Sequence, residues 1–358
     1  MYRSKEKLDQ LTVSPNVSIK DAIKQLDKAH EGIILAVNDD YKIEGIFTDP
    51  DFRRVALSDT SLDSSLSKVL NRNFVSLYEK EFTIEKAKET LKENAIFHLP
   101  ILNEEDQVID VVFETDFFRE RNLSDPGQQN LSVPTVIMAG GEGKRLDPFT
   151  RVLPKPLIPI GETPVIERII HNFQKSGSNK FYISIYYRAK TMKAYFEENL
   201  PDLNVNFIEE EKPLGTGGAL KLMEEELNQP FFLSNCDILI KAKYKEIYKF
   251  HEQTNNALTI VGSMKHHQIP YGICKTDNGE LEELVEKPEY DLLVNTGMYV
   301  LDPAVISYIP DEKKFDLTEL IEILLQKGEK VGVFPICSSS WIDIGQWAEY
   351  QEAIEELS

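Results

Sequence analysis

Four positively charged side chains follow a glycine-rich turn in the middle of the sequence. A short apolar run at 135–138 is typical of a buried strand, and the turn comes directly after it. The turn contains Ala139, Gly140, Gly141 and Gly143. The cations that follow are Lys144, Arg145, Arg151 and Lys155. Glycines allow backbone N–H groups to close on an anion, so the turn and the cations together predict a binding site for nucleotide phosphates.

Two common phosphate-binding motifs do not fit this turn. The P-loop, G-x-x-x-x-G-K-[ST], requires a glycine and a serine or threonine where this sequence has Met138 and Arg145. The dinucleotide fingerprint, G-x-G-x-x-G, requires a third glycine where this sequence has Leu146. The turn therefore belongs to neither class.

A longer pattern runs from the glycine turn through Arg-Leu and Pro-x-Thr to Pro-Lys-Pro-Leu-x-Pro. It resembles the sugar-phosphate nucleotidyltransferases, and the matching residues are Gly140, Gly141, Gly143, Arg145, Leu146, Pro148, Thr150, Pro154, Lys155, Pro156, Leu157 and Pro159. Lys144 departs from the family, which usually has threonine or serine there. The resemblance implies that a sugar 1-phosphate attacks the α-phosphorus of a nucleoside triphosphate, which gives a nucleotide sugar and pyrophosphate.

This reaction joins two anions, so it needs fixed cations and Mg²⁺ rather than a general base. The resemblance implies that Arg145 binds the β- and γ-phosphates and that Lys155 binds the α-phosphate. Asp237 and Asp343 match the two magnesium ligands of the family, and carboxylates are the ligands that Mg²⁺ prefers. The alternative is that these charged side chains only lie on solvated turns.

Further motifs of the family are associated with binding of the sugar phosphate and of the base. The resemblance implies that the sugar phosphate is bound by Gly272, Glu286, Lys287, Asn295 and Thr296. Residues 209–218 match the base-recognition segment, in which Gly215 permits close approach of the base. A carboxylate at Glu210 accepts from both the ring N–H and the amino group of guanine, which favours GTP. The alternatives are UTP, CTP or dTTP, with Glu210 as a solvated acid before a helix.

The first third of the sequence contains an internal repeat. Similar segments recur with a constant offset of 65 residues, at 18 and 83, at 34 and 99, and at 45 and 110. In each unit a polar residue precedes an amphipathic helix, and two strands and the start of a second helix follow. An ungapped repeat of this kind predicts two similar structural units in tandem.

This plan, with its Gly-x-x-Thr-x-x-Asp turn, resembles a pair of cystathionine-β-synthase (CBS) domains. The resemblance implies an α+β pair that often binds an adenine nucleotide, with Thr48 and Asp51 on the ribose and phosphate. The second repeat keeps Asp116 but has Asp110 and Phe113 in place of the glycine and threonine. The alternatives are a pair that only dimerises or packs on the enzyme, and aspartates that only cap helices.

The pattern of segments predicts the domain organisation. Residues 1–65 and 66–122 form the two repeats, 123–133 form a polar linker, and 134–358 form the catalytic domain. Strand and helix patterns alternate through 181–261, which predicts an α/β, Rossmann-like domain whose mostly parallel sheet has helices on both faces. Ligands bind such sheets at the carboxyl ends of the strands, where the glycine turn lies.

The sequence is strongly acidic. Its 358 residues include 60 acidic and 40 basic side chains, a formal net charge of −20, so neither nucleic acid nor an anionic membrane is expected as a partner. Three cysteines without metal-ligand spacing are typical of a reduced compartment. No leader-type start or membrane-length apolar run is found, so we expect a cytoplasmic protein, and CBS pairs commonly form symmetric homodimers.

The resemblance covers most of the sequence and implies a nucleotide-sugar pyrophosphorylase. Members with an N-terminal CBS pair are similar to glucosamine-1-phosphate and mannose-1-phosphate guanylyltransferases. They supply GDP-sugars for bacterial surface glycans, including GDP-glucosamine for the legionaminic acid pathway. The expected substrates are therefore GTP and a hexose or hexosamine 1-phosphate, and nucleotide at the CBS pair would regulate the enzyme. The alternative from another class is a nucleotide-sensing regulatory protein with an inactive transferase domain.

Overall fold

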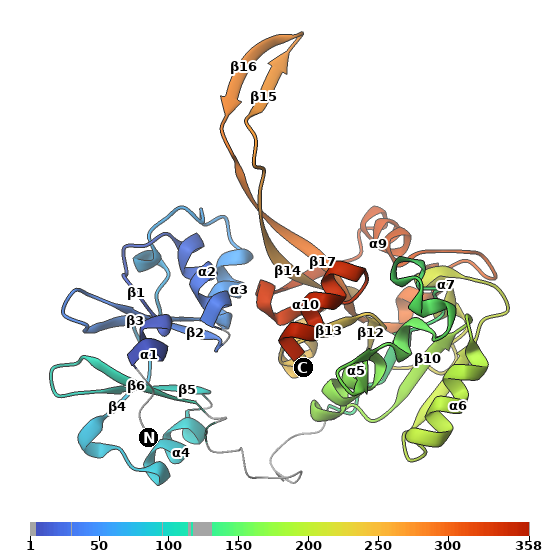
Figure 1. The fold of residues 1–358 in the computed structure, drawn as a ribbon, viewed down its shortest axis with the longest axis horizontal. Helices are drawn as coiled ribbons and strands as arrows, with labels where there is room; N and C mark the ends of the chain where they lie inside the picture. Colours follow the sequence, from blue (N-terminus) through green and yellow to red (C-terminus); the bar gives the residue numbers. More distant parts are fainter. Residues whose placement is uncertain (1–4, 30, 95, 114–115, 117–130, 358) are drawn as a thin grey trace. The chain divides into compact units, whose positions relative to one another are not determined.

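The chain divides into two compact units in the computed structural model. The structure describes residues 5–29, 31–94, 96–113, 116 and 131–357. The units are Met1–Gly127 and Gln128–Ser358 (Figure 1). Most of the linker predicted at 123–133 lies outside the described residues. Within the described part of the chain, no helix has the length and apolarity needed to cross a membrane.

The first unit contains the two predicted repeats. After α1 (Lys5–Leu11), the first repeat consists of β1 (Thr12–Val13), α2 (Ile19–Ala29), β2 (Ile33–Val37), β3 (Ile43–Thr48) and α3 (Asp49–Ala56). The second consists of β4 (Leu77–Tyr78), α4 (Ile84–Glu93), β5 (His98–Leu102) and β6 (Val108–Phe113). The order of strand, helix and two strands is thus confirmed in both repeats. The helix predicted after β6 lies largely outside the described residues.

Local sequence signals explain where the repeat helices begin. Ser18 precedes α2, and its Oγ accepts from the N–H of Asp21 at 3.0 Å. Thr83 precedes α4, and its Oγ1 accepts from the N–H of Lys86 at 3.0 Å. Such N-caps satisfy backbone donors that the first helical turn leaves unpaired. The strands form two three-stranded sheets, β1-β2-β3 and β4-β5-β6, whose side chains share one apolar cluster.

A seven-stranded sheet forms the centre of the second unit. Its order is β11-β10-β7-β12-β17-β14-β18. The strands are β7 (Thr135–Met138), β10 (Phe181–Ile185), β11 (Val205–Glu209), β12 (Phe231–Asn235), β14 (Leu258–Gln268), β17 (Glu289–Leu301) and β18 (Val331–Ile336). Strand β17 runs antiparallel to both of its neighbours, and the other neighbouring pairs are parallel, which confirms the mostly parallel sheet. Short strand segments outside the sheet also occur: β8 (Pro159–Ile160), β9 (Thr163–Pro164), β13 (Ile238–Ile240) and β19 (Trp341–Asp343).

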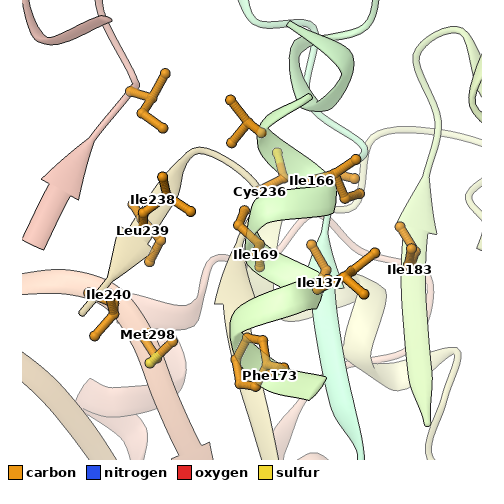
Figure 2. Close-up of a cluster of buried hydrophobic side chains, with 14 of the residues drawn as sticks. Ile137, Ile166, Ile169, Phe173, Ile183, Cys236, Ile238, Leu239, Ile240 and Met298 are labelled. Carbon is orange, nitrogen blue, oxygen red and sulfur yellow. The ribbon is translucent and has the colours of Figure 1, made fainter. Parts of the chain in front are cut away.

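Helices cover both faces of this sheet, as predicted. One apolar cluster contains side chains of α5 (Val165–Lys175), α6 (Ala189–Asn199), α8 (Tyr244–Thr254) and α10 (Trp347–Leu357). The other contains side chains of α7 (Gly215–Lys221) and α9 (Leu317–Gln326). Successive residues of a strand point to opposite faces, so Ile137 joins the first cluster (Figure 2), while Val136 and Met138 join the second. Each fully buried large side chain contributes about 1.5–3 kcal/mol of hydrophobic stabilisation.

Within the alternating pattern, residues 219–227 predict a helix, and the structure differs from this prediction. Helix α7 begins four residues earlier, at Gly215, and ends at Lys221. The glycines at 217 and 218 donate their backbone N–H groups to the carbonyl oxygen of Phe315. Contact with a distant segment therefore supports a helical start for which the local sequence has low propensity.

Two strands of the sheet continue beyond it as a long ribbon. The last residue of β14 that pairs with β18 is Ser263, but β14 and β17 remain paired as far as Gln268 and Glu289. The hairpin of β15 (Ile273–Asp277) and β16 (Glu280–Val285) follows. Figure 1 shows this ribbon, which we call the arm (residues 264–294), extending away from the sheet.

Candidate active site

A cavity lined by glycines and charged residues lies where the order of the strands reverses. The chain passes from β7 outward to β10 and β11, and then returns to β12 on the other side of β7. Ligands of open α/β sheets bind at such a position, outside the carboxyl ends of the strands. The cavity has a volume of about 500 Å³. Its lining includes the predicted residues Gly140, Gly141, Gly143, Arg145, Lys155, Glu210, Gly215 and Asp237.

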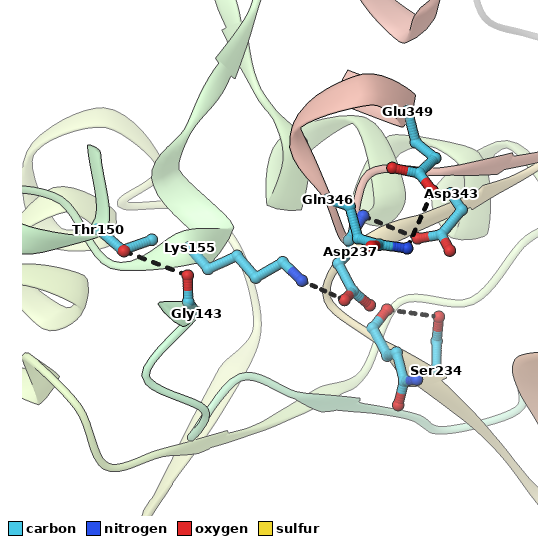
Figure 3. Close-up of polar contacts among 10 residues, drawn as sticks. Gly143, Thr150, Lys155, Ser234, Asp237, Asp343, Gln346 and Glu349 are labelled. Atoms are coloured by element: carbon cyan, nitrogen blue, oxygen red, sulfur yellow. Dashed lines mark hydrogen bonds and ion pairs between the residues drawn. The ribbon is translucent and has the colours of Figure 1, made fainter. Parts of the chain in front are cut away.

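The glycine turn is closely packed on one side and open on the other. Gly143 has φ +67°, and a methyl group there would lie 2.8 Å from Thr150 Cγ2 and 3.0 Å from Lys155 Cβ. The Thr150 hydroxyl donates to the Gly143 carbonyl oxygen at 3.2 Å (Figure 3). A methyl group at Gly140 would overlap Glu210 Oε1, whereas one at Gly141 would meet nothing within 4 Å. The turn is therefore held against the protein while Gly141 leaves space beside the cavity.

This packing predicts different effects for two neighbouring substitutions. Gly140→Ala is expected to lower the free energy of unfolding by about 1–3 kcal/mol, because its methyl group overpacks the contact with Glu210. Gly141→Ala, the matched control, should change it by no more than about 0.5 kcal/mol. Both tryptophans, Trp341 and Trp347, lie in the second unit, so tryptophan fluorescence during urea unfolding reports this unit selectively. Equal losses in the two variants would contradict the prediction.

The two predicted magnesium ligands lie side by side. Strand β13 pairs with β19 (Trp341–Asp343) so that Ile238 is opposite Asp343. The N–H of Ile344 donates to the carbonyl oxygen of Asp237 at 2.8 Å. A methyl group on Gly345 would lie 2.8 Å from Asp343 Oδ1 and 3.6 Å from both Asp237 Oδ2 and Arg145 Nη2. Two carboxylates and one guanidinium therefore converge around Gly345.

The charges in this cluster are only partly compensated. Lys155 is buried, and its Nζ forms an ion pair with Asp237 Oδ2 (Figure 3). Burial raises the pKa of the Asp343 carboxyl above its ordinary value, and the nearby Asp237 carboxylate adds to this rise. The N–H of Gly345, 2.7 Å from Asp343 Oδ1, and the Lys155 ammonium act in the opposite direction on that pKa.

The donor set of the cluster fits magnesium. Among the described residues, no group of three or more His, Cys, Asp or Glu side chains could hold a metal ion. Mg²⁺ is usually bound by one or two carboxylates, and substrate phosphates and water complete its coordination. Asp237 and Asp343 match that requirement. Cys236 is adjacent in sequence, but burial raises the pKa of its thiol to about 12, so it is a poor nucleophile and metal ligand.

The four cations predicted around the glycine turn differ in their surroundings. Lys144 forms an ion pair with Glu142 at 2.7 Å, and Arg151 forms one with Asp147 at 2.6 Å. Arg145 has no carboxylate oxygen of a described residue within 4.0 Å of its guanidinium, although it lines the cavity. Its positive charge is therefore available to an anion in the cavity.

Glu210 is fixed inside the cavity wall. It is 7% exposed, so it is a buried acid rather than a solvated one. The Ser184 hydroxyl donates to Glu210 Oε1, and the N–H of Leu214 donates to Glu210 Oε2 at 2.9 Å. Its neighbour Glu209 is exposed and pairs with Lys193 at 2.6 Å. The position of Glu210 fits a role in binding a base, which stays a prediction.

Two cavity residues, Lys314 and Asp316, were missed in the sequence. They lie about 100 residues from Gly215 along the chain and belong to no motif that we recognised. Gly215 has φ +77°, and a methyl group there would lie 2.5 Å from Asp316 Oδ1. The three glycines at 215, 217 and 218 indicate that another segment approaches closely, but the sequence does not indicate which segment it is.

The predicted sugar-phosphate residues do not line this cavity. Gly272, Glu286 and Lys287 belong to the arm and its connections, where a methyl group on Gly272 would lie 2.9 Å from Glu286 Oε2. Lys287 is exposed and has φ +45°, an uncommon conformation for a residue with a side chain. Asn295 donates to the Tyr299 hydroxyl at 2.7 Å, and Thr296 is buried and donates to the Val261 carbonyl oxygen at 2.8 Å. Their role in binding sugar stays a prediction.

The CBS residues form local hydrogen bonds. The N–H and the hydroxyl of Thr48 both donate to Asp51 Oδ2, at 2.9 and 2.8 Å. In the second repeat, the N–H of Phe113 donates to Asp116 Oδ2 at 2.9 Å, so the backbone bond is kept and the hydroxyl bond is lost. These contacts agree with a capping role for Asp51. Adenine nucleotide binding stays a prediction, which calorimetric titration with AMP and ATP would test.

Two domain families match the sequence. The nucleotidyl transferase family matches residues 134–358, and the CBS domain family matches residues 8–58 and 66–122. The mannose-1-phosphate guanyltransferase of Candida albicans is 34% identical over 223 residues, which are 59% of this chain and 60% of that protein. The mannose-1-phosphate guanyltransferase of Saccharomyces cerevisiae is 32% identical over 223 residues, which are 59% of this chain and 61% of that protein. The chain thus spans about 60% of the length of these curated relatives.

Solved structures resemble the second unit. HddC from Yersinia pseudotuberculosis is 27% identical, with a TM-score of 0.51, over 63% of this chain and 100% of that one. Its complex with GMP-PN is 26% identical, with a TM-score of 0.50 and the same coverage. A glucose-1-phosphate thymidylyltransferase assigned in Bacillus anthracis is 20% identical, with a TM-score of 0.51, and shares the fold.

Proposed function

Because the chain belongs to the nucleotidyl transferase family and carries a CBS pair before that domain, we propose that it is a sugar-1-phosphate guanylyltransferase. It transfers GMP from GTP to a hexose or hexosamine 1-phosphate and releases pyrophosphate. The observation that carries the proposal is the cavity, in which the glycine turn, Arg145, Lys155, Asp237 and Glu210 converge. The mannose-1-phosphate guanyltransferases and the GMP-PN complex of HddC support a guanine nucleotide.

Four charged residues have separate tasks in this reaction. A phosphate oxygen of the sugar 1-phosphate forms a bond to the α-phosphorus of GTP, and the bond from that phosphorus to the pyrophosphate oxygen breaks. Arg145, whose guanidinium is unpaired among the described residues, binds the departing phosphates. Lys155 is held beside the aspartates and binds the α-phosphate. Asp237 and Asp343 would hold Mg²⁺, which supplies positive charge to the phosphates when bound.

Glu210 has the hydrogen-bonding capacity that guanine requires. A carboxylate has about four acceptor positions, of which the Ser184 hydroxyl and the Leu214 N–H use two. The remaining two match the adjacent ring N–H and amino group of guanine. Uracil and thymine offer one ring N–H between two carbonyl groups, so one acceptor of Glu210 would face a carbonyl oxygen. The buried carboxylate therefore supports GTP over UTP and dTTP.

The sugar is the least constrained part of the proposal. The curated relatives support mannose 1-phosphate, while the CBS fusion resembles proteins that make GDP-glucosamine. A place in the legionaminic acid pathway rests on that resemblance alone. A regulatory protein with an inactive transferase domain is a weaker alternative, because the charged residues assigned to the nucleotide phosphates and Mg²⁺ converge at one site, namely Arg145, Lys155, Asp237 and Asp343.

A panel assay of pyrophosphate release tests the proposal. It crosses GTP, UTP, CTP and dTTP with the 1-phosphates of glucosamine, mannose, glucose and N-acetylglucosamine, with Mg²⁺ present and with EDTA as control. Release with GTP and one sugar, abolished by EDTA, is the expected result. Release with UTP, CTP or dTTP would keep the enzyme class and refute the guanine assignment. Absence of release in every combination would favour the regulatory protein.

A further inference from the structure

A short segment that directly precedes α9 is hydrogen-bonded to the start of α7. We call residues 313–316 the strap. Its Phe315 N–H donates to the Leu214 carbonyl oxygen at 2.8 Å, and its carbonyl oxygen accepts from Gly217 and Gly218 at 2.9 and 2.8 Å. A methyl group at Gly215 would lie 2.7 Å from that same carbonyl oxygen. The strap and the predicted base-recognition segment are therefore in a fixed register.

Hydrogen bonds of Leu214 connect the two segments that carry Lys314 and Glu210. Leu214 connects them, because its N–H binds Glu210 Oε2 and its carbonyl oxygen binds the N–H of the residue after Lys314. Both side chains line the cavity. Lys314 is exposed and has no carboxylate oxygen of a described residue within 4.0 Å of its Nζ. Its ammonium group is thus a donor without a carboxylate partner among the described residues, in the same lining as the carboxylate that we assign to the base.

We infer that Lys314 determines base specificity by donating to O6 and N7 of guanine while Glu210 accepts from the ring N–H and the amino group. This inference rests on the proposed function. An ammonium group pairs with the adjacent O6 and N7 acceptors of guanine. Adenine has an amino group in place of O6, and pyrimidines have no N7, so neither offers both acceptors. Lys314 would therefore contact the edge of the base that carries O6 and N7, and Glu210 the edge that carries the ring N–H and the amino group. Among the bases considered, only guanine has both sets of groups.

Three variants in the full-length protein test this inference. Lys314→Met keeps the length of the side chain and removes its charge, so kcat/KM for GTP should fall about tenfold or more. Lys314→Arg should keep most of the activity, because a guanidinium also pairs with O6 and N7. The matched control is Lys313→Met, an exposed residue of the strap that does not line the cavity. It should change kcat/KM less than about twofold.

A nucleotide analogue separates contact with the base from contact with phosphate. 7-deaza-GTP lacks N7 but keeps the ring N–H and amino group that Glu210 binds. The loss caused by Lys314→Met should be smaller with 7-deaza-GTP than with GTP. Equal losses with both nucleotides, or a loss no larger than in Lys313→Met, would overturn the inference. If the unsubstituted protein does not use GTP at all, the proposed function fails instead, so the two failures are distinguishable.

Discussion

The substitution Asp237→Asn is expected to reduce kcat/KM for pyrophosphate release about 10³-fold. The reason is that Asp237 faces both Lys155 and the carboxylate of Asp343, and it is one of only two carboxylates assigned to Mg²⁺. An asparagine keeps the size of the side chain and one oxygen that can accept from Lys155. It removes the negative charge that we assign to the metal ion and that pairs with the Lys155 ammonium. The effect should therefore appear mainly in turnover.

The same substitution should leave the fold largely intact. Loss of the Asp237 charge weakens the ion pair with Lys155, which destabilises the site. It also relieves the repulsion that raises the pKa of Asp343, which stabilises the site, so the two effects oppose each other. Urea unfolding followed by tryptophan fluorescence checks this. Asp202→Asn, an exposed aspartate of the same unit, is the control and should keep normal turnover. Near-normal turnover in Asp237→Asn would refute the metal assignment.

The sequence predicts those residues of the site that lie just after the end of a strand. The glycine turn follows β7 and Asp237 comes two residues after β12, and three successive apolar residues mark each strand, at 136–138 and 231–233. Because β7 and β12 are parallel neighbours, their carboxyl ends meet, which brings the turn and Asp237 to one cavity. Residues close to a recognisable strand end are thus positioned by rules that local sequence already contains.

Contacts between distant segments are not visible in the sequence. The strap reaches the start of α7 across about 100 residues, and only the glycines at 215–218 indicate that something must pack there. The burial of Glu210 likewise depends on Ser184, which is on another strand. For the arm, the motifs identify Gly272 and Lys287 but do not indicate that these residues lie apart from the cavity lining. Sequence patterns indicate residue types more reliably than tertiary neighbours.

Replacing Glu210 by glutamine is expected to change the base preference. Glutamine keeps one acceptor oxygen but presents an amino group where the carboxylate has a second acceptor. One of the two donors of guanine would then face a donor in a buried site, which costs free energy. Uracil offers a donor beside an acceptor, which a glutamine can pair. We therefore expect the ratio of kcat/KM for GTP to that for UTP to fall about 10³-fold.

A neighbouring glutamate provides a matched control for this substitution. Glu209→Gln makes the same chemical change one residue earlier, at an exposed side chain that pairs with Lys193 outside the cavity lining. It should leave the GTP to UTP ratio unchanged. Because glutamine can still accept from the Leu214 N–H, Glu210→Gln should also unfold at nearly the same urea concentration as the unsubstituted protein. If Glu210→Gln remains folded and keeps the GTP to UTP ratio of the unsubstituted protein, the carboxylate does not determine which base is bound. In that case specificity must come from other groups in the cavity.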